Sequence, residues 1–200
     1  MALPSLRFHK LNENVFDPTF ATRGSACFDI FSYFGNEHIS LWLDDPNAKQ
    51  ARQTKADREG KPYVLIYPQE RMLIPTGVTF DIPKDHSVRI HVRSSVALKQ
   101  GLLLANGEGV IDSDYVDPCF IILYNSSNTA RQIFSHTRYA QGELIKNYKY
   151  SLSESQFAPD QKTERDGGFG STGEQALSAT GIPITKKSEQ GPSTSTAGIY

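Results

Sequence analysis

The chain has 200 residues, a formal net charge of −1 and 38% hydrophobic residues. A charge this close to zero disfavours general binding to duplex nucleic acid, so we expect no direct nucleic-acid partner. The sequence contains no apolar run near the ~20 residues that span a bilayer, and its two cysteines form no CxxC pair, so neither a membrane-spanning helix nor a thiolate zinc site is expected. No apolar h-region is visible near the N-terminus, which predicts a cytoplasmic or nuclear protein, in a host-cell compartment if it is viral.

Two segments are too polar to belong to a core. Asp44–Lys61 could form a helix capped by Asp45, with Pro46 at its first position and Gly60 just past its end. Such a helix would have no apolar face to bury, so a solvated helix and a disordered loop are both open. Glu174–Tyr200 is rich in Ser, Thr, Gly and Lys, which predicts a disordered tail.

Short strands separated by turns are predicted between these segments. Ser87–Arg93 alternates between apolar and polar side chains, which is typical of a half-buried strand. The predicted strands are Arg71–Ile74, Val78–Ile82, Ser87–Arg93 and Cys119–Tyr124. Strands at this spacing, with turn signals between them, predict an all-β sandwich or barrel.

The junction after Ser87–Arg93 is a candidate anion site. Ser94 or Ser95 would cap a short helix there. Val96–Gln100 would form this helix and Gly101 would end it. Free N–H groups at the helix start, together with an arginine and two hydroxyls, would suit a phosphate; the alternative is a capped helix beside a surface arginine.

Asp112 follows the apolar pair Val110-Ile111 directly and is a second candidate. A carboxylate after a strand often forms a turn through its own backbone hydrogen bonds. The alternative is a general base at the rim of the core.

The segment Gly167–Gly173 surrounds Phe169 with glycines and follows Arg165. A flexible arm that closes over a ligand would use such glycines for close approach and Phe169 for stacking on a base. The alternative is a glycine-rich linker into the tail.

Other catalytic patterns are missing from the sequence. The five histidines show no HExxH or HxH spacing, and no GxSxG elbow or Walker A loop occurs. These observations exclude zinc-hydrolase, serine-hydrolase and P-loop interpretations. His91 falls on the polar face of its predicted strand and is expected at the surface or at an interface.

Five segments, taken in this order, resemble the motifs of the trimeric dUTP diphosphatases (dUTPases). The segments are Ala21–Ile30; Ile74–Gly77 leading to Val92–Ala97; Gly109–Tyr115, closing at Asn125; Arg138–Gln141; and Arg165 with Gly168–Gly173.

The resemblance implies a jelly-roll-like β-barrel and a homotrimer with active sites at subunit junctions. It also implies the hydrolysis of dUTP to dUMP and diphosphate, with Mg²⁺ carried on the triphosphate. The dUTPase-like domain would cover residues 1–173, with an insertion at about 44–61 and a flexible arm at about 163–173. Residues 174–200 would be the disordered tail.

The resemblance further implies a role for each candidate residue. Asp112 would be the base, Asp29 would hold a metal-bound water and steady Arg93, and no side chain would bind the metal directly. Among the substrate-binding residues, Ser94 and Ser95 would hold phosphate together with Arg93, and Gln141 would contact the α-phosphate. Asn106 and the backbone from Ile111 would bind uracil, and Tyr115 would lie beneath deoxyribose. Phe169 and Gly170 would lie over the base, and Arg165, Ser171 and Thr172 would contact the outer phosphates.

The sequence departs from the family pattern in three places. The third motif continues as Val116-Asp117-Pro118, and Arg165 lies one residue closer to Phe169 than is usual. The polar insertion is unusually long, and a surface loop or an added trimer contact is expected there.

Two rival functions would use the same fold. The dCTP deaminases share the fold but need a glutamate ten residues after the third-motif aspartate, where this chain has Ile122. A non-enzymatic interaction protein built on the same fold would use the insertion and the tail as a partner arm; Asp112, Arg93 and Phe169 favour retained activity.

Overall fold

The computed structural model describes residues 4–35, 37–42, 49–160 and 162–163. The chain divides into two units, Met1–Tyr150 and Ser151–Tyr200. The described strands and helix all belong to the first unit, and the described residues of the second unit form neither. In the described part of the chain, no helix has the length and apolar character needed to cross a membrane.

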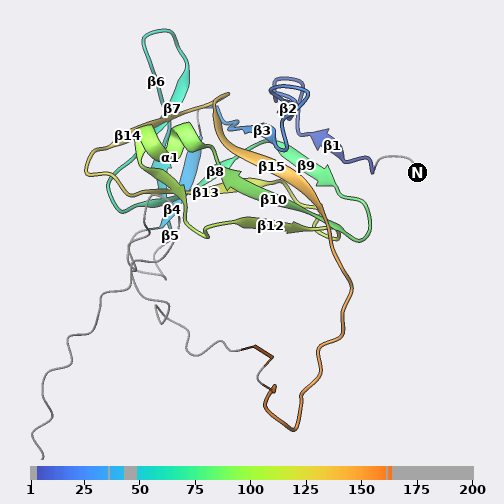
Figure 1. The fold of residues 1–200 in the computed structure, drawn as a ribbon. Helices are drawn as coiled ribbons and strands as arrows, with labels where there is room; N and C mark the ends of the chain where they lie inside the picture. Colours follow the sequence, from blue (N-terminus) through green and yellow to red (C-terminus); the bar gives the residue numbers. More distant parts are fainter. Residues whose placement is uncertain (1–3, 36, 43–48, 161, 164–200) are drawn as a thin grey trace, which may run out of the picture. The chain divides into compact units, whose positions relative to one another are not determined.

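The first sheet has five antiparallel strands in the order β12-β10-β15-β3-β2 (Figure 1). Its strands are β2 (Thr19–Phe20), β3 (Phe28–Phe31), β10 (His86–Val92), β12 (Gly109–Asp112) and β15 (Arg138–Lys146). This sheet carries Asp29, Ile111, Asp112 and Gln141, and Arg93 directly follows β10.

The second sheet also has five antiparallel strands, in the order β11-β13-β8-β4-β5. Its strands are β4 (His38–Trp42), β5 (Lys49–Gln53), β8 (Arg71–Pro75), β11 (Leu102–Leu104) and β13 (Phe120–Asn125). Two smaller sheets are β14-β7-β6 and β1-β9. Their strands are β1 (Arg7–Lys10), β6 (Lys55–Ala56), β7 (Pro62–Ile66), β9 (Val78–Asp81) and β14 (Arg131–Phe134).

A single hydrophobic cluster joins the sheets. Val88 and Ile90 of β10 are 0% and 3% exposed, and they alternate with polar residues as the sequence pattern predicts. Ile74 of β8 and Ile121 of β13 belong to the same cluster. The prediction of an all-β, jelly-roll-like fold with one short helix is confirmed.

The insertion folds differently from both alternatives drawn from its composition. Its residues 44–48 lie outside the described part, but residues 49–53 form β5 and residues 55–56 form β6. Strand β5 pairs along β4, and Arg52 of β5 is ion-paired to the buried Glu70 at 2.5 Å. An edge strand can carry polar side chains because its backbone bonds to one neighbour only, so polar composition did not indicate this strand. The predicted tail, Glu174–Tyr200, lies outside the described residues.

The short helix begins earlier than predicted. Helix α1 spans Ser94–Gln100, its N-cap is Arg93, and no side chain caps it. The predicted serine cap is therefore wrong: both serines lie in the first turn and are exposed. Strand β10 leads directly into the helix, and the Arg93 carbonyl accepts the N–H groups of Val96 and Ala97. The predicted end is confirmed, because Gly101 adopts φ 64° at the C-cap.

Candidate functional site

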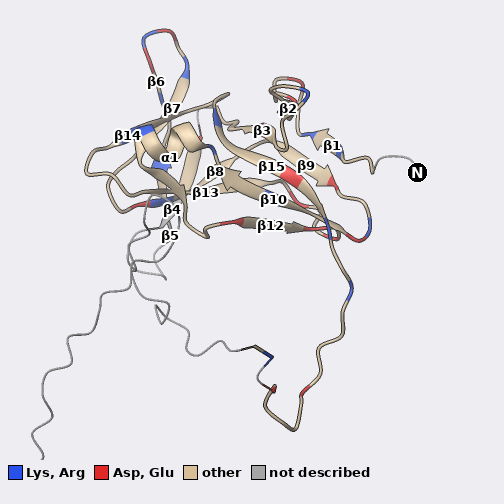
Figure 2. Ribbon diagram, in the orientation of Figure 1, with Lys and Arg blue, Asp and Glu red and all other residues tan. Residues whose placement is uncertain are grey.

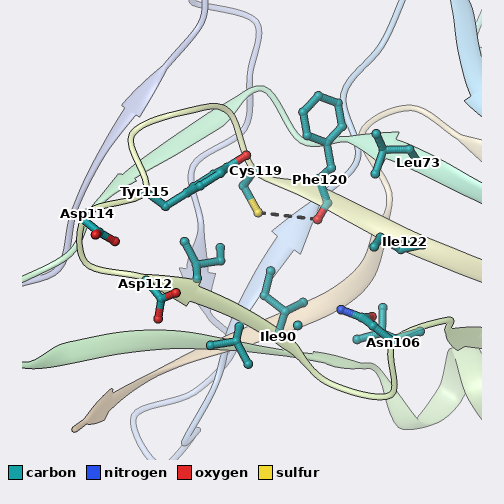
Figure 3. Close-up of a pocket in the computed structure, with 13 residues that line it drawn as sticks. Leu73, Ile90, Asn106, Asp112, Asp114, Tyr115, Cys119, Phe120 and Ile122 are labelled. Carbon is teal, nitrogen blue, oxygen red and sulfur yellow. Dashed lines mark hydrogen bonds between the residues drawn. The ribbon is translucent and has the colours of Figure 1, made fainter. Parts of the chain in front are cut away.

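A pocket of about 680 Å³ lies beside the loop that connects β12 to β13. Four predicted site residues line it: Asn106, Ile111, Asp112 and Tyr115. Figure 3 shows Asp112 and Asn106 along the β12 side of the pocket, with the ring of Tyr115 across from them. Apolar side chains from the second sheet complete the wall; they include Leu73, Phe120 and Ile122. The pocket therefore combines apolar surface for a flat ring with polar groups at its edges.

The local fold fixes Asp112 and Tyr115. Asp112 ends β12 opposite Ser87, and Ile111 beside it is only 8% exposed, which anchors the strand to the core. The Tyr115 N–H donates to the Asp112 carbonyl at 3.2 Å, which closes a tight turn. The Tyr115 hydroxyl donates to the carbonyl of Pro118 at 3.2 Å. Burial, together with the nearby Asp117, raises the pKa of Tyr115.

The unusual hairpin exit is well anchored. The Cys119 N–H donates to the Val78 carbonyl at 2.7 Å, and the Thr76 hydroxyl donates to the Cys119 carbonyl at 2.7 Å. Burial raises the pKa of the Cys119 thiol to about 12. Val116-Asp117-Pro118 therefore leads back into β13 without loosening the pocket.

A second group of predicted residues centres on Asp29 of β3. The Asp29 carboxylate is 7% exposed, and its two oxygens each accept one guanidinium. Arg93 Nε lies 2.9 Å from Oδ1, and Arg138 Nη1 lies 2.9 Å from Oδ2. Gln141 of β15 stands opposite Asp29 in the strand register. The exposed Ser94 and Ser95 follow Arg93 directly.

This arrangement holds two arginines next to each other with their charge half compensated. Arg93 and Arg138 keep side-chain exposures of 27% and 46%, so both retain donors for a ligand. Guanidinium groups bind phosphate through paired, charge-assisted hydrogen bonds. Sequence reasoning assigned no role to Arg138; its place three residues before Gln141 in the fourth motif was the available signal.

The Asp112 pocket and the arginine pair on Asp29 do not meet within one chain. Asp112 pairs with Ser87 near the start of β10, whereas Arg93 follows the far end of that strand. Arg93 lies six positions after Ser87, which places Asp112 and Arg93 about 20 Å apart at ~3.3 Å per residue. The predicted residues Arg165, Phe169, Gly170, Ser171 and Thr172 lie outside the described residues.

Within the described residues, no three His, Cys, Asp or Glu side chains gather in a way that could hold a metal ion. Both oxygens of Asp29 are occupied by arginines.

The jelly-roll-like fold thus carries two separate features: a pocket that has apolar walls and a carboxylate, and an arginine pair suited to phosphate. Together they are typical of an enzyme that binds a nucleotide. The chain matches the dUTPase family model over residues 59–173. It is 34% identical over 169 residues to the deoxyuridine 5'-triphosphate nucleotidohydrolase of Nautilia profundicola, covering 84% of this chain and 98% of that protein. Identity to the same enzyme of Finegoldia magna is 37% over 156 residues, covering 78% and 90%. The chain therefore belongs to the dUTPase family, as the five motifs predicted.

Solved structures agree on the fold. The Staphylococcus bacteriophage 80alpha dUTPase with dUPNHPP superimposes with a TM-score of 0.64 at 20% identity, covering 84% of this chain and 98% of that one. The dUTPase from phage phi11 of S. aureus gives a TM-score of 0.59 at 19% identity, covering 77% and 97%.

Proposed function

We propose that the protein hydrolyses dUTP to dUMP and diphosphate. The observation that carries this proposal is the pocket that brings Asn106, Asp112 and Tyr115 together in a chain of the dUTPase family. Asn106 and the backbone from Ile111 read the uracil edge, and Tyr115 packs beneath deoxyribose, where a 2′-hydroxyl would clash.

Asp112 is the base in this proposal. Its carboxylate orients a water molecule and takes a proton from it as the water attacks the α-phosphorus. Phosphoryl substitution depends mainly on an aligned nucleophile and on neutralised charge rather than on an unusual side chain. A carboxylate at the pocket rim supplies the first, and the arginine pair supplies part of the second.

The second group holds the phosphates. Arg93, Ser94 and Ser95 grip the triphosphate, and Gln141 contacts the α-phosphate. Arg138 joins them, since Asp29 fixes it next to Arg93. Mg²⁺ would be carried by triphosphate oxygens and water, with Asp29 near a metal-bound water, and would neutralise phosphate charge.

We assign the closing role to the C-terminal arm. Phe169 stacks on uracil with Gly170 beside it, and Arg165, Ser171 and Thr172 close on the outer phosphates. Stacking of a base on an aromatic ring contributes about 1–3 kcal/mol. The dUTPase-like domain would then cover residues 1–173, with the insertion at about 44–61 as part of it and residues 174–200 as a tail.

The working form would be a homotrimer that shares its sites. A separation of about 20 Å between Asp112 and Arg93 is too long for both to serve one reacting phosphate within a chain. A neighbouring copy resolves this, because it brings its own arginine pair to the Asp112 pocket. Tyr148 and Tyr150, which follow β15, are 85% and 81% exposed and offer apolar surface for such a contact.

Such an activity limits the incorporation of uracil into DNA and supplies dUMP for thymidylate synthesis. The two described cysteines are unpaired, which fits a reducing compartment such as the cytoplasm or nucleus.

The test is diphosphate release from dUTP with Mg²⁺, with UTP and dCTP as competing substrates. We expect turnover of dUTP and almost none of the other two. Asp112→Asn should lose turnover by orders of magnitude while still binding a non-hydrolysable dUTP analogue. Asp117→Asn, in the same hairpin but outside the pocket lining, is the matched control. Comparable turnover of UTP would refute the role given to Tyr115, and ammonia release from dCTP would favour the deaminase alternative.

A further inference from the structure

Four charged or titratable side chains form a network on the first sheet, outside both groups described above. Arg89 and His91 stand on the polar face of β10, between its buried residues. Arg89 Nη1 donates to Glu108 Oε2 at 3.2 Å, and His91 Nδ1 lies 3.9 Å from Glu108 Oε1. His91 Nε2 lies 3.1 Å from Glu143 Oε1 on β15. Glu108 therefore faces two basic side chains of the neighbouring strand.

Glu108 and Asn106 lie in the same turn, which connects β11 to β12. Two short backbone hydrogen bonds shape this turn, from the Gly107 N–H to the Leu104 carbonyl at 3.0 Å and from the Glu108 N–H to the Asn106 carbonyl at 2.8 Å. Gly107 adopts φ 71°, which favours glycine. Asn106 is itself exposed, so its position over the pocket depends on how the turn is held.

We propose that Glu108, held by Arg89, is a positioning residue that sets Asn106 for recognition of the uracil ring. This inference rests on the proposed dUTP hydrolysis. Glu108 does not line the pocket, and it acts by tying the turn to β10. His91 lies beside Glu108 and contacts Glu143 on β15, the strand that carries Gln141.

The expected effect is on binding of the base rather than on the chemical step. Glu108 and Arg89 keep 46% and 29% side-chain exposure, and partly exposed ion pairs make small contributions. Glu108→Ala should raise KM for dUTP about two- to fivefold, in line with loss of one such pair, and leave kcat unchanged. The preference for dUTP over dCTP should fall with it.

The experiment measures kcat and KM for the full-length protein with Glu108→Ala, Arg89→Ala and the double variant. If Glu108 and Arg89 act through their shared ion pair, KM of the double variant should be no higher than that of the more affected single variant. Arg89→Lys, which keeps the charge, should recover most of the lost affinity. Asp81→Ala is the matched control, because it removes an exposed ion pair to Arg7 on the β1-β9 sheet.

A binding measurement separates this inference from the proposed function. Glu108→Ala should weaken binding of dUMP and leave binding of inorganic diphosphate unchanged. If wild-type protein turns over dUTP but dUMP binding and KM are unaffected by Glu108→Ala, the positioning role is refuted and the proposed function stands. Additive single effects, or equal losses in dUMP and diphosphate binding, would also refute it. Failure of wild-type protein to hydrolyse dUTP would overturn the proposed function and this inference with it.

Discussion

Two inactive variants should restore each other when their subunits are mixed. Asp112→Asn removes the carboxylate of the pocket, and Arg93→Ala removes one of the two arginines on Asp29. Each variant alone should lose turnover by orders of magnitude. Because the two positions lie about 20 Å apart in one chain, each site should draw them from two different subunits.

The activity expected of the mixture follows from a site that is built by two subunits. A site is intact only when the subunit that supplies Asp112 carries the Arg93 change and its neighbour carries the Asp112 change. With equal, randomly mixed subunits each condition holds half of the time, so about a quarter of the sites should be intact in a head-to-tail ring. Activity should therefore rise from near background to about 25% of wild type at the same total protein concentration, if intact sites work independently.

The assay is diphosphate release after co-refolding, with native mass spectrometry to confirm that mixed oligomers form. Asp112→Asn mixed with Asn106→Ala is the matched control, because both residues line one pocket of one chain and mixing cannot restore it. Confirmed mixed oligomers without any gain over the parent proteins would refute the shared site. A gain in the control mixture would refute the assignment of both residues to one subunit.

Three further predictions concern stability. Asp29→Asn should leave two guanidiniums uncompensated and cost about 3 kcal/mol, which would lower Tm by roughly 6–12 °C; a shift below ~2 °C in thermal unfolding would contradict this. Burial raises the pKa of Cys119 and of Tyr139 to about 12, so above pH ~8.5 the unfolded chain releases protons first and the free energy of unfolding should fall by up to ~1.4 kcal/mol per pH unit per ionised group. Urea unfolding across this range checks the sign, and Cys119→Ala should flatten the slope. Arg52→Ala should cost about 3 kcal/mol because it leaves the buried Glu70 carboxylate unpaired, and adding Glu70→Gln should recover part of the loss.

The strand pattern could be predicted where side-chain alternation is strong. Ser87–Arg93 was predicted as a half-buried strand, and β10 spans His86–Val92 with its apolar residues in the core. The insertion could not be predicted in this way. Strand β5 owes its form to pairing with β4 and to the ion pair of Arg52 with Glu70, which lies 18 residues further along the chain.

The sequence predicts which residues form the candidate site, and the structure brings Asn106, Ile111, Asp112 and Tyr115 together in one pocket, but the distance from this pocket to Arg93 could not be predicted. The resemblance to the dUTPases implies roles for Asp112 and Arg93 without indicating how far apart they lie. That distance depends on the register of β12 against β10, in which Asp112 stands opposite Ser87. The role of Arg138 was missed for a related reason, because its closeness to Arg93 depends on both side chains meeting Asp29.

The low net charge of the chain is consistent with a site that relies on a few ordered arginines. A triphosphate is strongly anionic, yet the net charge is only −1, and Lys and Arg are interspersed with Asp and Glu along the drawn ribbon (Figure 2). A carboxylate near phosphate is unfavourable by itself, but Asp29 offsets the mutual repulsion of Arg93 and Arg138 and holds both in place. Donors fixed before the ligand arrives lose little freedom on binding, so two arginines ordered in this way hold phosphate better than a diffuse basic surface with the same charge.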